Sequence, residues 1–195
     1  SGEPVTSPLV LRPPQIPMAR WIQDVPRCAL WAGMGIGKSS ATLFQLEVMR
    51  LCGEIGDPTL VIGPKRVAEG TWPAEAAKWD QFEHLRVVPL KGTPTQRLAL
   101  LQKRAEIFTI SYDLLPWLVG HFGAKWPFRT VVADESDRLQ GFRQRGGGER
   151  ATALARVARN LTQRWVNLTG TPAPAGYHNL WGQTWFLDFG QRLGL

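Results

Sequence analysis

The fold of this chain is decided by ten residues, Trp31-Ala32-Gly33-Met34-Gly35-Ile36-Gly37-Lys38-Ser39-Ser40. They follow an apolar run, 28–31, that is typical of a buried strand, and they precede residues 41–50, whose apolar side chains have helical spacing. A strand, a glycine-rich loop ending in Gly-Lys-Ser and a helix form the context that a phosphate-binding loop requires. Glycine lets successive backbone N–H groups point at one anion, and the helix adds the positive end of its dipole. The stretch therefore predicts a site for the phosphates of a nucleoside triphosphate.

Within this loop, Lys38 is predicted to contact the β- and γ-phosphates, and the Ser39 hydroxyl to ligate Mg²⁺. The other residues expected to contact the nucleotide are Gly33, Met34, Gly35, Ile36, Gly37 and Ser40. Ala32 stands where the pattern G-x-x-x-x-G-K-[ST] has its first glycine, which is a mild departure. The alternative is a glycine-rich turn with a chance Gly-Lys-Ser, which would bind no phosphate.

Composition is consistent with one globular domain. The chain has 195 residues, of which 44% are hydrophobic and 20% charged. No apolar run approaches the ~20 residues that a membrane span needs, so we expect no membrane association. Lys and Arg number 23 against 16 Asp and Glu, and the resulting net charge of +7 favours a polyanionic partner such as nucleic acid. Cys28 and Cys52 lack zinc-site spacing, and we expect both to be core residues of a reduced, cytoplasmic protein.

Short apolar runs alternate with helical stretches along the whole chain. Strands are expected at 28–31, 60–62, 85–90, 107–110, 130–133 and 165–168, and helices at 18–22, 41–50, 74–79, 94–104, 114–122, 149–160 and 180–189. This alternation, with strands that lack polar residues on either face, predicts an α/β fold: a parallel sheet between two layers of helices. Ligands of such folds bind beyond the carboxyl ends of the strands.

A second group of chemical interest is Asp134-Glu135, directly after the expected strand 130–133. An aspartate there can hold Mg²⁺ through water, and the next glutamate can polarise an attacking water. Alone, such a pair is more often a helix cap. Combined with a phosphate-binding loop roughly a hundred residues earlier, it predicts nucleoside triphosphate hydrolysis.

Five ordered motifs resemble those of superfamily 2 helicases, in particular the Swi/Snf branch with its compact bacteriophage members. They are the Q motif at 11–15, motif I at 32–39, motif Ia at 61–66, motif II at 134–137 and motif III at 168–172. Residues 72–75, 111–115 and 180–181 are similar to the Swi/Snf branch in particular. The resemblance covers 11–195 and implies the first RecA-like domain of a P-loop NTPase, whereas residues 1–10 are interpreted as a tag remnant and an extended lead-in.

The resemblance implies a role for each motif. Gln15 would read the adenine of ATP, Lys38 would serve the phosphates, and Ser39 and Asp134 would hold Mg²⁺. Glu135 would act as the general base. Residues implied to lie along DNA are Lys65, Arg66, Ser111 and Tyr112, and those implied to couple nucleotide to DNA are Thr169, Gly170 and Thr171. The alternatives are a solvated loop at Lys65 and Arg66, and helix capping and packing at Ser111 and Tyr112.

Two departures from the family pattern stand out. Asp137 replaces the usual histidine of motif II, which puts its contacts to motif III in doubt. The second RecA-like domain, which closes the ATP site and supplies arginine fingers in this family, lies outside the 195 residues, so this chain alone is expected to be catalytically incomplete.

Taken together, these motifs predict the ATP-binding domain of a DNA helicase or translocase that acts on duplex DNA in a bacterial or phage-infected cell. Its cofactors would be ATP and Mg²⁺, and its partners DNA and a second RecA-like domain. The alternative is a non-catalytic module that binds nucleotide and DNA. A small-molecule kinase would explain neither Gln15 nor 169–172.

Nine tryptophans also suggest base stacking, but packing is the simpler expectation. Trp31, Trp165 and Trp185 lie in apolar runs and are predicted to be core residues, and packing is favoured for Trp126 as well.

Overall fold

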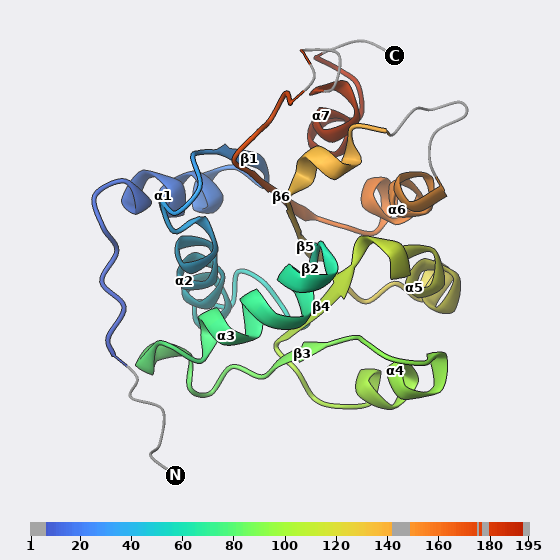
Figure 1. Cartoon of the computed structure of the whole chain (residues 1–195), viewed down its shortest axis with the longest axis horizontal. Coiled ribbons are helices and arrows are strands. Elements are labelled where there is room, and N and C mark those ends of the chain that lie inside the picture. The colour runs from blue at the N-terminus through green and yellow to red at the C-terminus, as the bar shows by residue number, and fades with distance from the viewer. Residues whose placement is uncertain (1–6, 142–148, 175, 177–179, 193–195) are drawn as a thin grey trace.

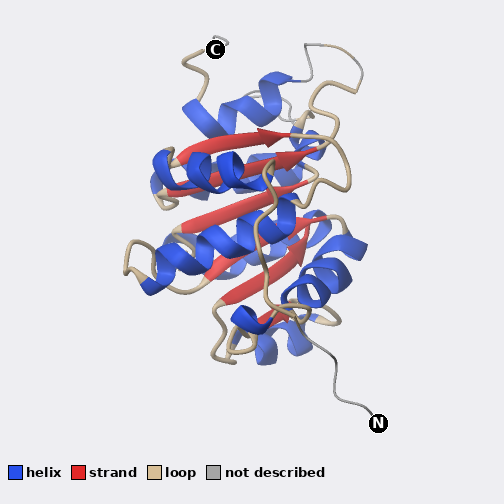
Figure 2. Ribbon diagram, turned by 90° about the vertical axis from the view of Figure 1, so that its left-hand side faces the viewer, coloured by secondary structure: helices blue, strands red, loops and turns tan. Residues whose placement is uncertain are grey.

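The computed structural model describes residues 7–141, 149–174, 176 and 180–192. A six-stranded sheet runs through these residues, with every neighbouring pair parallel and the order β1-β6-β5-β2-β4-β3. The strands are β1 Arg27–Trp31, β2 Thr59–Gly63, β3 Val87–Pro89, β4 Ile107–Ser111, β5 Thr130–Asp134 and β6 Arg164–Thr169. Figure 2 shows the arrows side by side and pointing the same way.

Helices cover both faces of the sheet (Figure 1). One face carries α1 Gln15–Asp24, α2 Lys38–Leu51 and α3 Trp72–Ala76. The other carries α4 Pro94–Leu101, α5 Leu115–Phe122, α6 Glu149–Asn160 and α7 Leu180–Asp188. Short turns of helix are η1 Val67–Thr71, η2 Asp80–Phe82, η3 Tyr112–Leu114, η4 Gly123–Lys125 and η5 Ser136–Leu139. The predicted three-layer α/β fold is confirmed.

Burial explains why the central strands lack polar alternation. Every residue of β2 and of β4 is buried, because helices cover both faces of these strands. Two clusters of apolar side chains result, one on each face of the sheet. Trp165 and Phe186 stack at 4.9 Å between ring centroids in one cluster, and Met49 and Trp72 are fully buried in the other.

Three expectations from the sequence are wrong in detail. Trp31 is 46% exposed, because β1 is the edge strand and Trp31 is its last residue. Cys52 is exposed, because it follows the last turn of α2, whereas Cys28 is buried in β1 as expected. The helix expected at 74–79 lies earlier in the chain: a π-helical turn begins at Val67, and α3 runs from Trp72 to Ala76. Pro73 does not break α3, because it stands in the first turn, where a helix tolerates proline.

Register determines which loops meet at the carboxyl edge of the sheet. Trp31 pairs with Thr169 across β1 and β6, and Asp134 pairs with Leu168 across β5 and β6. The loops that follow β1, β6 and β5 therefore leave the sheet at the same level. Segments that are far apart in sequence become neighbours at this edge.

Candidate functional site

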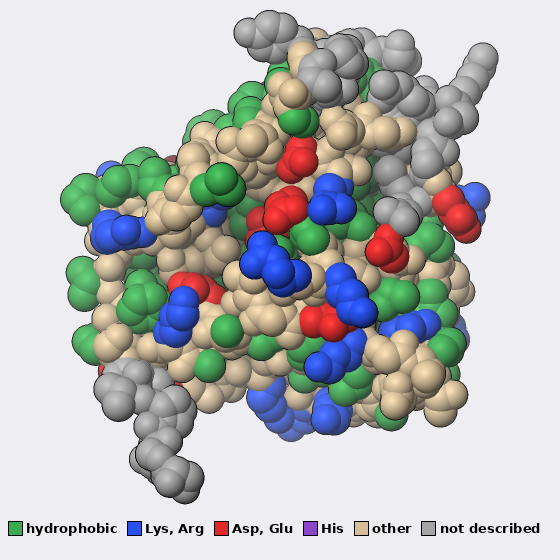
Figure 3. Space-filling view, viewed as in Figure 1, with side chains coloured by type: hydrophobic (Ala, Val, Ile, Leu, Met, Phe, Trp, Pro, Cys, Tyr) green, Lys and Arg blue, Asp and Glu red, His purple; other side chains and the backbone are tan. Residues whose placement is uncertain are grey.

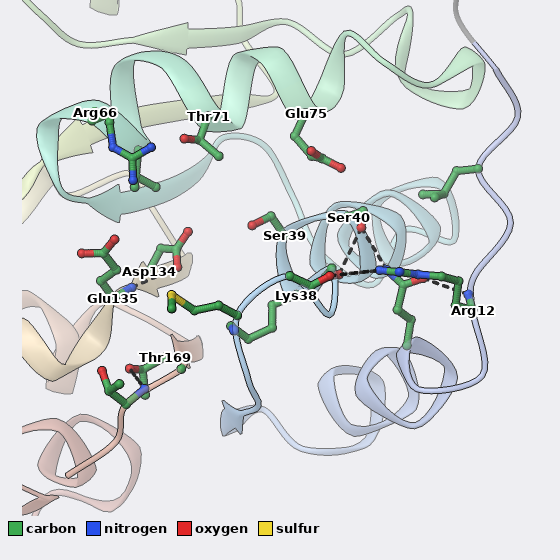
Figure 4. Close-up of a pocket in the computed structure, with 18 of the residues that line it drawn as sticks. Arg12, Lys38, Ser39, Ser40, Arg66, Thr71, Glu75, Asp134, Glu135 and Thr169 are labelled. Atoms are coloured by element: carbon green, nitrogen blue, oxygen red, sulfur yellow. Dashed lines mark hydrogen bonds between the residues drawn. The ribbon is translucent and has the colours of Figure 1, made fainter. Parts of the chain in front are cut away.

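A cavity of about 640 Å³ lies at the carboxyl ends of β1, β2, β5 and β6. Figure 4 shows Asp134 and Glu135 on one side of Lys38 and Ser39, and Arg12 on the other. The predicted residues that line the cavity are Gln15, Met34, Gly35, Gly37, Lys38, Ser39, Ser40, Arg66, Asp134, Glu135, Thr169, Gly170 and Thr171. Those outside its lining are Gly33, Ile36, Lys65, Ser111 and Tyr112.

The loop 32–37, which the sequence predicts to bind phosphate, owes its shape to two glycines. Gly35 and Gly37 have φ of 77° and 85°, in the left-handed region that favours glycine. Gly37 caps α2, whose first residue is Lys38, so the free N–H groups of the helix start at the cavity. The Lys38 ammonium donates to the carbonyls of Ala32 at 2.6 Å and Gly33 at 2.9 Å. Burial lowers the pKa of Lys38, and the charge of Asp134 opposes that change.

Gln15 holds the loop from the side of α1. Its side chain is 2% exposed, and its Nε2 donates to the Gly37 carbonyl and the Ser40 hydroxyl, both at 3.0 Å. Its Oε1 accepts the backbone N–H of Arg12 at 2.8 Å. The Arg12 guanidinium in turn donates to the Ile36 carbonyl at 3.0 Å. Gln15 therefore supports the loop as well as lining the cavity.

Asp134 is fixed on the opposite side of the cavity by two donors. Its Oδ2 accepts the indole N–H of Trp72 at 2.9 Å, and its Oδ1 accepts the backbone N–H of Glu135 at 2.9 Å. Burial raises the pKa of the Asp134 carboxyl, whereas these two hydrogen bonds lower it. The phenol of Tyr112 donates to the Asp134 carbonyl at 2.9 Å, which anchors the backbone at the same place.

Glu135 has an unusual backbone conformation. Its φ of 50° and ψ of 53° lie in the left-handed region, which is costly for a residue with a side chain. Its carboxylate is 42% exposed and lies 3.4 Å from the Arg138 Nε. A strained residue at the mouth of a cavity is typical of a functional position.

Motif II and motif III are in direct contact. The Thr169 hydroxyl donates to Oδ1 of Asp137 at 3.0 Å and accepts the backbone N–H of Thr171 at 3.1 Å. Thr169 is 2% exposed, and its contact with Asp137 is part-buried at the wall of the cavity. Asp137 therefore keeps a link to motif III that the absence of histidine had put in doubt.

The sequence model of the SNF2-related domain family matches residues 17–191. The chain belongs to this family. The resemblance deduced from the five motifs is therefore confirmed, and membership of this family implies nucleotide binding.

Two relatives show how much of a longer protein the chain represents. It is 50% identical over 184 residues to protein p41 of Acyrthosiphon pisum secondary endosymbiont phage 1, covering 94% of this chain and 40% of that protein. It is 27% identical over 193 residues to the ISWI chromatin-remodeling complex ATPase ISW1 of Saccharomyces cerevisiae, covering 91% and 16%. The chain spans less than half the length of these relatives.

Solved structures share the fold. The Sulfolobus solfataricus SWI2/SNF2 ATPase core in complex with dsDNA is similar with a TM-score of 0.72 at 23% identity, covering 96% of this chain and 38% of that one. The Sulfolobus solfataricus SWI2/SNF2 ATPase core domain gives 0.69 at 24%, covering 96% and 37%.

The residues implied to lie along DNA differ in their surroundings. Lys65 and Arg66 are exposed after β2, and Arg66 also lines the cavity. Ser111 and Tyr112 are both 5% exposed, and burial raises the pKa of the Tyr112 phenol well above its ordinary value. The structure thus favours packing for Tyr112, whose hydroxyl anchors the backbone of Asp134.

Charge on the surface is mixed. On the face shown in Figure 3, Lys and Arg side chains alternate with Asp and Glu, so the net charge of +7 forms no single-sign field over that face. None of the helices in the described residues has both the length and the apolar character to cross a bilayer.

The donor set in the cavity fits a Mg²⁺–nucleotide. A serine hydroxyl and an aspartate carboxylate, from Ser39 and Asp134, are hard oxygen ligands of the kind that Mg²⁺ takes together with phosphate oxygens. The helix start at Lys38 faces the same cavity and suits the phosphates.

The sequence assigned no role to several polar residues at this site. Arg12, Thr71 and Glu75 line the cavity, and Trp72 contacts Asp134 from behind it. The position of Arg12, three residues before Gln15, was a signal for a shared loop contact. Trp72 could not be linked to Asp134 by pattern, because the contact spans 62 residues.

Proposed function

We propose that the chain is the ATP-binding RecA-like domain of a DNA translocase. With a second RecA-like domain, it hydrolyses ATP to ADP and phosphate and couples hydrolysis to movement along duplex DNA in the cytoplasm of a bacterial or phage-infected cell. One observation carries the proposal: Lys38, Asp134, Glu135 and Thr169 meet in a single cavity although they come from the start of α2 and the ends of β5 and β6.

Each residue has a chemical task in this proposal. Lys38 exchanges its two carbonyl partners for phosphate oxygens, whose negative charge binds an ammonium more strongly than a neutral carbonyl does. Gln15 supports the loop through both N–H groups of its amide, and the remaining lone pair of its Oε1 is available to accept from the adenine edge. The Glu135 carboxylate takes a proton from the attacking water, and its partial exposure leaves it accessible to that water.

Ser39 and Asp134 would hold Mg²⁺, which supplies charge neutralisation for the transferred phosphoryl group. The pre-set hydrogen bonds of Asp134 keep its carboxylate aimed at one place, which reduces the reorganisation that binding requires.

Contact with DNA is proposed at Lys65 and Arg66, which are exposed and carry the charge that phosphates attract. In the Sulfolobus solfataricus relative, the named partner is dsDNA. The Thr169–Asp137 hydrogen bond would couple nucleotide and DNA, with Gly170 and Thr171 continuing the same loop.

The test is DNA-stimulated ATP hydrolysis by the chain alone and after a second RecA-like domain is supplied. Lys38→Ala and Glu135→Gln should each lower turnover by at least ~10²-fold, because each removes charge or a base from the transition state. Lys103→Ala, an exposed lysine outside the cavity lining, is the matched control and should retain turnover.

Normal turnover by either cavity variant would contradict the site assignment. Nucleotide binding without hydrolysis in every combination of domains would favour the non-catalytic module instead.

A further inference from the structure

Trp72 contacts Asp134, a residue of the cavity wall, from a segment that the proposed function assigns only to DNA. It is the first residue of α3, and its indole N–H donates to Oδ2 of Asp134 at 2.9 Å. The Trp72 side chain is fully buried, so water cannot replace this acceptor. An indole N–H in this position is therefore a fixed partner of the carboxylate.

The segment 64–76 joins Trp72 to the proposed DNA contacts. Lys65 and Arg66 stand near its start, and the helical turns η1 and α3 follow without a break. The backbone N–H of Ala68 donates to the Pro64 carbonyl at 2.9 Å, and the Thr109 hydroxyl donates to the Ala68 carbonyl. Because these helical turns are continuous, we expect the segment to shift as one body, so that a displacement at Lys65 would reach Trp72.

The Asp134 carboxylate would respond to such a displacement. One oxygen is held by the backbone of Glu135 and the other by Trp72. Because hydrogen bonds are directional, a shift of the indole rotates the carboxylate about its other bond. The close packing of Gly63 helps to transmit the shift, since a Cβ there would lie 3.2 Å from Val67 and 3.7 Å from Cβ of Asp134.

We propose that Trp72 is a positioning residue that ties the segment 64–76 to Asp134, so that DNA bound at Lys65 and Arg66 changes the affinity for the Mg²⁺–nucleotide. This inference rests on the proposed function and adds a second route of coupling, separate from the Thr169–Asp137 contact.

Thermodynamic linkage makes the tie measurable without turnover, since the nucleotide must change DNA affinity by the same factor as DNA changes nucleotide affinity. The measurement is fluorescence anisotropy of a labelled duplex, with and without Mg²⁺ and a non-hydrolysable ATP analogue. In the wild-type chain the two DNA affinities should differ by about fivefold or more. Trp72→Phe should bring their ratio towards one while DNA affinity without nucleotide stays within about twofold.

Trp126→Phe is the matched control. It removes a buried indole N–H that donates to the Phe128 carbonyl at 2.9 Å, outside the cavity lining, and should leave the ratio unchanged. Thr109→Val is a second, nearly isosteric variant that loosens the segment at Ala68 without touching Trp72, and it should lower the ratio in part. Thermal unfolding shows whether each variant is folded, and Thr109→Val decides the question if Trp72→Phe is not.

The proposal is overturned by any of three results. Folded Trp72→Phe keeps the wild-type ratio of DNA affinities, or Trp126→Phe lowers that ratio equally, or the wild-type ratio is one although both ligands bind. The last result leaves the proposed function standing, because nucleotide and DNA still bind. A wild-type chain that binds no nucleotide contradicts both.

Discussion

The two sides of the cavity are held in different ways. On the loop side, Lys38 and Arg12 donate to backbone carbonyls that are partly open to solvent, and a phosphate can replace those carbonyls. On the acidic side, Asp134 and Thr169 make part-buried contacts with Trp72, Tyr112 and Asp137, and two of these three partners are at most 5% exposed. Under the proposed function, nucleotide binding would exchange partners on the loop side, whereas the acidic side would be preorganised.

Gly37→Ala is expected to have the largest effect on nucleotide affinity among the variants that alter the shape of the loop. The residue has φ of 85°, and an added Cβ would collide with Nε2 of Gln15 and lie 2.9 Å from the Arg12 guanidinium. Left-handed backbone costs a residue with a Cβ roughly 1–2 kcal/mol, so nucleotide affinity should fall about tenfold or more. Isothermal titration with the ATP analogue measures this, and Gly56→Ala, where a Cβ meets open space, is the control. Unchanged affinity would show that the loop shape is not set by this glycine.

Gln15→Ala should have the next largest effect. It deletes hydrogen bonds to Gly37, Ser40 and Arg12 from a side chain that is 2% exposed. Loss of buried partners costs about 1–3 kcal/mol, so both the melting temperature and nucleotide affinity should fall. Calorimetry and titration measure the two effects. Gln23→Ala, on the same helix but outside the cavity lining, should lower only stability. An equal loss of affinity in both variants would remove the special role of Gln15.

Thr169→Val probes the acidic side and should leave nucleotide affinity nearly unchanged. The substitution keeps the shape of the side chain but removes its contacts with Asp137 and the Thr171 N–H. A hydrogen bond to a charged group is worth about 1.5 kcal/mol at the low end of its range, which suits a part-buried carboxylate, so DNA-stimulated turnover should fall about tenfold. Thr162→Val, whose hydroxyl donates to the Phe128 carbonyl at 3.4 Å, is the control. A fall in affinity without a fall in turnover would reverse the comparison between the two sides.

Glu106→Gln should have the smallest effect of the four variants, a change in stability alone. Glu106 lies outside the cavity lining, so the variant is a reference for the loss of a polar contact away from the site. The Arg86 guanidinium, which hydrogen-bonds its carboxylate, lowers the pKa of Glu106 from 4.5 to about 2. Because the folded-state pKa is the lower one, this contribution to stability is present above about pH 4.5 and is lost as the pH falls to about 2. Melting temperatures of wild type and variant should therefore differ most near neutral pH and converge towards pH 2. A difference that does not depend on pH would contradict this origin.

Local pattern was sufficient for most of the fold. The apolar runs of β2, β4 and β5 predicted a sheet buried on both faces, and the loop 31–40 predicted the strand and helix around it. Pattern failed at Trp31, because an apolar run looks the same in an edge strand as in a central one. It also failed at 67–71, where the helical turn is the wider π form.

Thirteen of the predicted site residues line one cavity, and their motifs could be recognised because each is continuous in sequence. Tyr112 and Ser111 could not be placed in the same way, because whether a residue after a strand faces solvent or the core depends on what packs over it. Tyr112 turns towards the carbonyl of Asp134, 22 residues away in sequence.

The sequence by itself determined where the glycine-rich loop and the Asp-Glu pair stand and how strands and helices follow one another along the chain. Each of these features depends on residues within one turn or one strand. The tertiary structure decided that Trp72 holds Asp134, that Asp137 bonds Thr169 and that Gln15 supports Gly37. These contacts depend on the register of β5 and β6 and on the packing of α1 and α3 over the sheet. Such long-range geometry comes from burying the faces of the whole sheet at once, and no local stretch of sequence contains it.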